Sequence, residues 1–379
     1  MTGSRVVLLT GGSGVVGSAL LPYLVEAADT EIVLLLRAGS ADALATRRRA
    51  CLDFAAGRMR RDHEARVAAV RGDVAETSLG LAPADHASLV ERVTHIVHAA
   101  GVVKLNQPLD AARRSAIDGV AHALEFARAC AAHRPPPKME YLSTVGVAGR
   151  RSGVVPEAPL DDVAGYHNTY EQAKAEAEAM ALAASREGLP ITVHRPSMVV
   201  GDSRDGRVIH FQVFYHLARF IAGARTRGIV PAFGDVRLDL VPSDYVARAI
   251  ATSMTRADAT GRILHLCAGP GGAMPLDEVG ERVRAFLAAH GEAIGPPRHV
   301  PRSMVRLFAR VGGAVVPGSA GRALASLPHF LDYLAEDQRF ANAQTAAFFA
   351  RENLRPPPIA SYLDTVLEYW HARRAPAHA

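Results

Sequence analysis

Residues 6–17 read VVLLTGGSGVVG, an apolar run of strand length followed by a turn built on Gly11, Gly14 and Gly17. A helical pattern of apolar residues begins at Val15 and continues to about residue 28. A strand, a tight glycine turn and a helix N-terminus form a phosphate cradle, because unpaired backbone N–H groups and the helix dipole favour an anion. The stretch therefore predicts dinucleotide binding. The residues expected at the cofactor are Gly11, Ser13, Gly14, Val15, Val16 and Gly17.

The rest of the chain alternates between apolar strand patterns and helical patterns. Strands are expected at about 6–10, 32–36, 67–70, 95–99, 139–143, 191–194 and 263–266, and helices at 15–28, 41–60, 84–92, 108–132 and 167–187. This alternation predicts an α/β fold with a doubly wound parallel (Rossmann) sheet of about seven strands. The alternation stops at residue 201, and residues 270–379 show no further strand repeat. We therefore expect a nucleotide-binding domain at 1–200 plus about 240–268, and a smaller, mostly helical substrate lobe at 201–239 plus 269–379.

Composition narrows the class of protein. The chain has 379 residues, of which 49% are hydrophobic and 21% charged, as in an ordinary globular protein. Its net charge of +5 comes almost entirely from arginine, and no nucleic-acid-binding motif accompanies it, so no nucleic-acid partner is expected. The three cysteines have neither disulfide nor metal-ligand spacing. The chain shows no membrane-spanning run and no signal-peptide pattern, so a cytoplasmic location is expected.

The end of the second predicted strand indicates which dinucleotide binds. An NAD-binding protein usually has an acidic residue there for the ribose 2′-hydroxyl, whereas this chain has Arg37. A guanidinium would pair with a 2′-phosphate, so we expect NADP(H), with Ser40, Arg47 and Arg48 as further candidates. The alternative is that Arg37 simply faces solvent in an arginine-rich chain.

Further cofactor contacts are expected after the third and fourth strands. Asp73 would accept a hydrogen bond from the adenine amino group, or else it serves the turn alone, and Val74 adjoins it. Small residues follow the fourth strand, where the cofactor must approach the backbone closely: Ala99, Ala100 and Gly101. No metal site is expected at His95 and His98, because their spacing on a strand directs the side chains to opposite faces.

Chemistry is expected from three side chains. Tyr170 and Lys174 are four residues apart at the start of a helix, so they share one face. A nearby ammonium favours phenolate, which would make Tyr170 an acid–base group near neutral pH. Thr144 ends the fifth strand, at the sheet edge where ligands bind, and would donate a second hydrogen bond to a carbonyl oxygen. A surface tyrosine–lysine pair is the alternative interpretation.

Together these motifs resemble the extended short-chain dehydrogenase/reductase superfamily over residues 1 to about 250. The stretches 33–38, 70–81 and 141–145 look like its thioester-reductase and fatty-acyl-CoA-reductase branch. The resemblance implies a catalytic set of Thr144, Tyr170 and Lys174, with Lys174 also holding the nicotinamide ribose. It further implies a nicotinamide-side segment from Pro196 to Val199 that includes Ser197. The family commonly has an asparagine where this chain has Ala116, and that asparagine supports the lysine through a water.

The leading hypothesis for function is NADPH-dependent reduction of an acyl thioester, on coenzyme A or an acyl carrier protein, to an aldehyde or alcohol. A ketone or alcohol dehydrogenase, or an epimerase, would use the same residues and remains the alternative. A non-enzymatic NADP-sensing protein is disfavoured because Tyr170 and Lys174 are both retained.

The sequence allows two interpretations for each of two apolar segments. The helix around residues 208–221 would either wall an acyl tunnel or belong to the core. Residues 302–316 place arginines on one stripe and apolar residues on another, as in a helix that contacts a membrane surface or an acidic carrier protein, although a solvated face over a packed one is the ordinary explanation. Peripheral membrane contact is therefore not expected.

Overall fold

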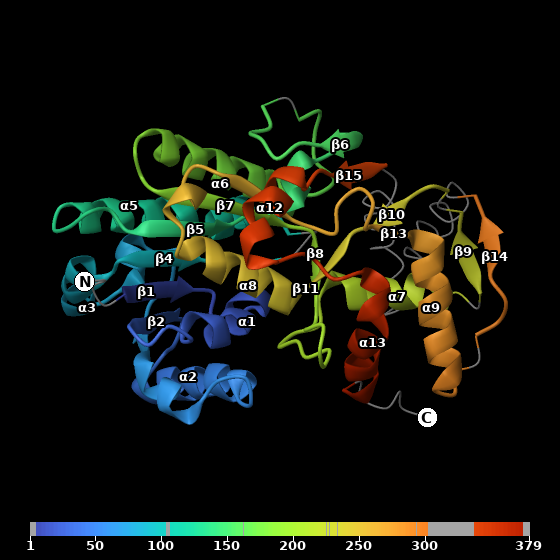
Figure 1. The fold of residues 1–379 in the computed structure, drawn as a ribbon, viewed down its shortest axis with the longest axis horizontal. Coiled ribbons are helices and arrows are strands. Elements are labelled where there is room, and N and C mark those ends of the chain that lie inside the picture. Colours follow the sequence, from blue (N-terminus) through green and yellow to red (C-terminus); the bar gives the residue numbers. More distant parts are fainter. Residues whose placement is uncertain are drawn as a thin grey trace.

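A parallel sheet of seven strands forms the centre of the protein (Figure 1). The computed structural model describes residues 5–103, 107–161, 163–224, 226, 228–232, 234–292, 294–301 and 337–373. The strands lie in the order β12-β7-β5-β4-β1-β2-β3. Their bounds are Arg5–Thr10 (β1), Thr30–Leu36 (β2), Val67–Arg71 (β3), His95–His98 (β4), Lys138–Leu142 (β5), Ile191–Pro196 (β7) and Ile263–Leu266 (β12). Every neighbouring pair is parallel, which confirms the predicted Rossmann sheet.

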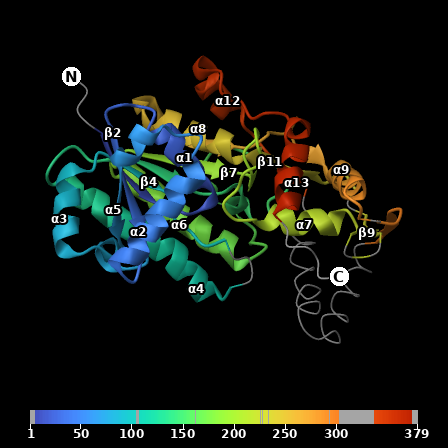
Figure 2. The same ribbon diagram turned by 90° about the horizontal axis from the view of Figure 1, so that it is seen from below.

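Helices cover both faces of the sheet (Figures 1 and 2). One face carries α1 (Val15–Leu24), α2 (Ala41–Ala55) and α8 (Ser243–Met254), and the other carries α3 (Pro83–Arg92), α5 (Gly119–Ala131) and α6 (Thr169–Arg186). Strand β1 shows why its residues are apolar on both sides: Val7 and Leu9 pack in the core under α1, while Val6 and Leu8 pack in the opposite core. The predicted helix 108–132 is interrupted. It consists of α4 (Leu109–Arg113), a π-helical turn (Arg114–Asp118) and α5.

A second helical group lies at one end of the molecule, beyond the sheet (Figure 1). It contains α7 (Val213–Ile221), α9 (Leu276–Ala289) and α13 (Leu363–Ala372), whose buried residues share one core. Short strands pair around this group and beside the sheet: β8 (Met198–Val200) with β11 (Leu240–Pro242), β9 (Ile229–Pro231) with β14 (Arg298–Val300), β10 (Arg237–Leu238) with β13 (Met274–Pro275), and β6 (Gly153–Val155) with β15 (Gln338–Phe340). After residue 270, where the sequence shows no further strand repeat, the described strands are these isolated pairings of two or three residues, which leave no periodic pattern.

The remaining elements are short. They comprise α12 (Ala343–Phe348) and the 3₁₀ turns Arg61–Arg66, Thr77–Gly80, Val145–Ala148, Ala257–Ala259, Ala350–Glu352 and Ile359–Ser361. Phe348, Phe349 and Leu354 pack into the sheet core beside α8, although the predicted domain division places them in the lobe. The predicted helix at 302–316 lies outside the described residues. Among the helices that the structure does describe, none is both long enough and apolar enough to cross a bilayer.

Candidate active site

The glycine turn between β1 and α1 requires glycine for steric reasons. Gly11 has a φ of +73°, and a Cβ there would lie 2.5 Å from the backbone of Ala99 at the end of β4. A Cβ on Gly17 would lie 2.1 Å from the Gly11 carbonyl oxygen, so this glycine lets α1 pack directly on the turn. Gly14 precedes α1, which has neither a side-chain N-cap nor an acidic residue in its first turn. The first N–H groups of α1 are thus left for an anion.

The opposite end of the expected cofactor site lies at the tips of β2 and β3. The side chain of Arg37 is 68% exposed and forms a long ion pair, 3.9 Å, with Asp73. The Asp73 carboxylate also accepts from the Ala75 N–H at 3.0 Å, a hydrogen bond within the turn after β3. Arg47 lies exposed on α2. Arg48 is not a cofactor candidate, because its guanidinium donates to the carbonyls of Val67 and Glu64.

Two neighbours in this region have structural contacts of their own. Ser40 caps α2, its hydroxyl oxygen accepting from the Ala43 N–H at 3.2 Å. The carbonyl of Val74 contacts the imidazole Nδ1 of His122 at 2.9 Å, which holds the loop after β3 against α5.

Thr144 and Tyr170 line one cavity of about 180 Å³ above the glycine turn. It unites ten of the residues singled out from the sequence: Gly14, Val15, Val16, Ala99, Gly101, Thr144, Tyr170, Pro196, Ser197 and Val199. They come from the ends of β4, β5 and β7, from the turn before α1 and from the start of α6. Parallel strands bring these segments to a single edge of the sheet, where ligands bind in such folds.

The start of α6 is held firmly. Asn168 caps the helix, its side-chain oxygen accepting from the Glu171 N–H at 2.9 Å. The Glu171 carboxylate in turn accepts from the backbone N–H of His167 and from the Asn168 amide. This reciprocal cap fixes Tyr170, which lies between these residues in the first turn.

The prediction that Lys174 makes the Tyr170 phenol more acidic was wrong for this structure. Tyr170 is half-buried, and its removal from water, together with the Glu171 carboxylate, raises its pKa to about 12, while hydrogen bonding with Thr144 acts in the opposite direction. Burial likewise lowers the pKa of Lys174 to about 8. A phenol with a raised pKa is protonated at neutral pH, the form needed to donate a proton.

Lys174 itself is directed to β5. Its ammonium donates to the phenolic oxygen of Tyr141 at 3.0 Å and to the carbonyl of Leu142 at 2.7 Å. Lys174 and Tyr170 both line a second, very small cavity, which Ala116 also borders. Ala116 lies in the π-helical turn and offers no polar side chain.

Sequence reasoning missed a buried network on the same helix face. Glu178 accepts a short hydrogen bond from the Ser143 hydroxyl and pairs with the guanidinium of Arg195. A further N–H of Arg195 donates to the Ala158 carbonyl. The spacing of Tyr170, Lys174 and Glu178 at four-residue intervals on one helix would have indicated this residue.

The rest of the cavity lining is mainly apolar. It includes Val103, Val145, Met198 and Val213, with Gln212 as a polar neighbour. The rest of α7 belongs to the core, where its main apolar residues are buried: Phe214, Leu217, Phe220 and Ile221. The core interpretation of this helix therefore holds, and only its first residues reach the cavity.

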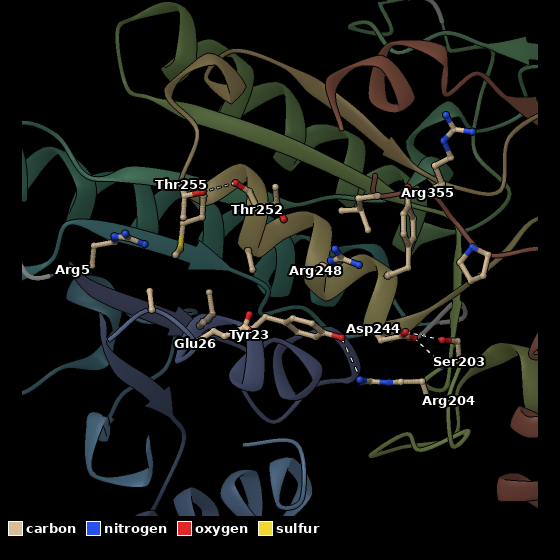
Figure 3. A pocket seen from close by; sticks show the side chains of 17 residues that line it. Arg5, Tyr23, Glu26, Ser203, Arg204, Asp244, Arg248, Thr252, Thr255 and Arg355 are labelled. Atoms are coloured by element: carbon tan, nitrogen blue, oxygen red, sulfur yellow. Dashed lines mark hydrogen bonds between the residues drawn. The ribbon is translucent and has the colours of Figure 1, made fainter. Parts of the chain in front are cut away.

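A larger groove, of about 750 Å³, lies between α1 and α8 (Figure 3). In it the Tyr23 hydroxyl accepts from Arg204, and Asp244 accepts from the Ser203 hydroxyl and N–H. No lysine is among the residues that line this groove, and none of the expected catalytic side chains reaches it. Size alone therefore does not identify the reactive site.

Thiol and metal chemistry find no support in the described residues. Cys51, Cys130 and Cys267 are all buried outside the cavity, and burial raises the pKa of each thiol. In the part of the chain that the structure describes, no three histidine, cysteine or acidic side chains gather as a metal site.

Comparison with known proteins identifies the family. Residues 9–250 match the family model described as male sterility protein, a family of NAD-binding domains. The chain belongs to this family. It is therefore an oxidoreductase of the extended short-chain dehydrogenase/reductase superfamily, in the thioester-reductase branch, and it binds a nicotinamide dinucleotide. The resemblance inferred from the motifs is confirmed.

Individual relatives agree with this assignment. The terminal R domain of the myxalamid PKS-NRPS pathway is 27% identical, with a TM-score of 0.80 over 98% of this chain and 92% of that one. The glycine betaine reductase ATRR of Emericella nidulans is 29% identical over 70% of this chain. The isonitrile lipopeptide synthase of Streptomyces coeruleorubidus is 32% identical over 64% of this chain. The matches span only 21% and 16% of these two proteins.

Proposed function

We propose that this reductase transfers hydride from NADPH to an acyl thioester carried by an acyl carrier protein or coenzyme A, releasing an aldehyde. One observation carries the proposal: Thr144 and Tyr170 face the same cavity as the glycine turn and the segment from Pro196 to Val199. Hydroxyl donors and a dinucleotide cradle thus meet at one point, as carbonyl reduction requires.

The residues present fit the cofactor. The uncapped N-terminus of α1 and the close approach of Gly11 to Ala99 suit a pyrophosphate, and Arg37 with Arg47 suits a 2′-phosphate. Asp73 and Val74 would border the adenine, while Ala100 and Gly101 would border the path to the nicotinamide. Lys174 would hold the nicotinamide ribose. When bound, the reduced nicotinamide supplies a hydride to the carbonyl carbon.

The side chains of the protein then supply and remove the proton on the carbonyl oxygen. Tyr170 donates its phenolic proton to the carbonyl oxygen as the C–H bond forms, and Thr144 donates a second hydrogen bond to that oxygen. The resulting hemithioacetal returns its hydroxyl proton to Tyr170 as the C–S bond breaks. The departing thiolate takes a proton from water. One thioester, one hydride and one proton give one aldehyde and one thiol, and no cysteine nucleophile takes part.

The relatives favour a thioester over a free ketone as the substrate. The myxalamid protein is a terminal R domain of a PKS-NRPS, and the Streptomyces relative is a lipopeptide synthase. The mainly apolar substrate side of the cavity is compatible with the acyl part of such a thioester. Reduction of a free ketone remains the second candidate, because it would use the same donors. A second reduction would convert the aldehyde to an alcohol.

A substrate panel tests the proposal. Purified protein would be incubated with NADPH and either acyl-carrier thioesters, acyl-CoAs or free ketones, while thiol release and aldehyde formation are measured. We expect aldehyde and free thiol in equal amounts from at least one thioester class. Turnover of ketones alone would overturn the thioester assignment, and NADPH binding without turnover of any substrate would favour a sensing role.

Cofactor preference gives a separate prediction. We expect Arg37→Ala to lower kcat/KM for NADPH by about 30-fold, because a charge-assisted pair with the 2′-phosphate is lost, and to leave the NADH value nearly unchanged. Arg49→Ala, on the same helix as Arg47 but paired with Asp53, is the matched control and should leave both values unchanged. An Arg37→Ala protein that kept its preference for NADPH would refute the assignment.

A further inference from the structure

The end of β5 and one face of α6 form a ladder of side-chain contacts. Thr144 interacts with Tyr170, Tyr141 and Leu142 accept from Lys174, and Ser143 donates to Glu178. Four consecutive residues, the last two of β5 and the two that follow it, thus meet three helix residues that are spaced by four. Three of these four contacts involve residues of the expected catalytic set, and Tyr141 contributes a side chain to which the sequence analysis gave no role.

We infer that Tyr141 is the positioning residue for Lys174: its phenolic oxygen, together with the Leu142 carbonyl, fixes the ammonium beside the cavity that Lys174 shares with Tyr170. The inference rests on the proposed function, because Lys174 is taken to act in catalysis. It adds to that function a residue that touches neither substrate nor cofactor.

The physical argument begins with the cost of burying an ammonium. Lys174 is only 6% exposed, and a buried charge must be compensated by hydrogen bonds or an opposite charge. Its long, flexible stem would otherwise let the ammonium move. Tyr141 is fully buried in a central strand, and its ring stacks on His98 with centroids 6.0 Å apart. An acceptor on such a rigid side chain holds the ammonium in one place.

The groups that face Lys174 determine its charge. Glu178, on the same helix, raises the pKa of Lys174, and burial lowers it. His98, on β4, is buried, and its pKa falls to about 3, so it stays neutral. Burial raises the pKa of Tyr141 well above its ordinary value and that of Tyr170 to about 12, so both phenols are protonated near neutral pH. Tyr141 thus helps to retain the proton on Lys174 as a neutral acceptor.

The test exploits the scarcity of lysine. The chain has only Lys104, Lys138 and Lys174, so a protein labelled with 13C at lysine Cε gives three signals, and Lys174→Met identifies that of Lys174. In protein without cofactor or substrate, the wild-type signal should titrate near pH 8. Tyr141→Phe removes one oxygen atom and should lower this midpoint by about one pH unit, because the charged form loses an acceptor.

The same variant is then assayed as an enzyme. Its kcat/KM for the thioester should decline with rising pH about one unit earlier than in the wild type, with little change in KM for NADPH. Tyr362→Phe is the matched control: it loses an equally buried hydrogen bond, to the Leu240 carbonyl, far from Lys174 in the sequence and in a different core. It should lower thermal stability without moving the Lys174 midpoint.

The outcomes separate the two proposals. An unchanged Lys174 midpoint in Tyr141→Phe would overturn the positioning role. Should that protein fail to fold, Tyr141→Met, a flexible apolar replacement, is expected to give the same shift. If Tyr141→Phe shifts the Lys174 midpoint but the wild-type protein reduces no thioester, the positioning contact is upheld and the proposed function is refuted.

Discussion

We expect Tyr170→Phe to lower kcat for thioester reduction by about a thousandfold, within the range attributed to general acid–base catalysis. The variant keeps the ring and removes only the hydroxyl that would protonate the carbonyl oxygen. Single-turnover kinetics with saturating NADPH would measure the loss at the chemical step.

Binding provides the control for this variant. The affinity for NADPH, measured by fluorescence titration, should change by less than about threefold, because the proposed function assigns most of the cofactor contacts to the glycine turn and to Arg37. Tyr166→Phe, four residues earlier and outside the cavity lining, is the matched substitution and should retain most activity. A Tyr170→Phe protein with near wild-type kcat would eliminate Tyr170 as the acid.

The second large effect is expected at the glycine turn. Gly17→Ala would place a methyl group 2.1 Å from the Gly11 carbonyl oxygen, closer than any Cβ can approach backbone. Helix α1 must then move away from the turn, at a cost of about 3 kcal/mol in the free energy of unfolding. We also expect NADPH affinity to fall by about 100-fold, since the N–H groups at the start of α1 would be displaced.

Thermal unfolding and NADPH titration measure these two effects. Gly271→Ala is the control, because nothing lies within 4 Å of the added Cβ and the backbone there is not left-handed. It should resemble the wild type in both measurements. If Gly17→Ala and Gly271→Ala had the same thermal stability and the same NADPH affinity, close packing of α1 on the turn would be unnecessary for folding and for cofactor binding.

The sheet and the cavity wall could be predicted because each has a local signature. Seven short, mainly apolar runs marked the strands, the first two of them continuously apolar, and every one is present in the sheet. The turn at Gly11, Gly14 and Gly17 marked the ligand edge. Strand ends meet at that edge in any parallel sheet, so Thr144, Tyr170 and Pro196 came together as expected.

Side-chain contacts and pKa values depend on tertiary surroundings and could not be predicted from the sequence. The effect of Lys174 on Tyr170 was overestimated, because sequence spacing gives no measure of burial and because the ammonium is directed to Tyr141 and Leu142. From the sequence, Arg47 and Arg48 were both candidates for the 2′-phosphate. In the structure, the guanidinium of Arg48 donates to two backbone carbonyls instead. The role of Tyr141 depends on which strand lies next to α6, which no local pattern reports.

Deuteride transfer tests the central claim most directly. NADPH carrying deuterium at the transferable C4 position would be mixed with the enzyme and an acyl-carrier thioester, and the volatile or trapped aldehyde analysed by mass spectrometry. The proposed function predicts aldehyde with one deuterium on the former carbonyl carbon, together with an equal amount of free thiol. Thiol release with deuterium in neither the aldehyde nor an alcohol formed from it, or deuterium incorporation only with ketones, would contradict it.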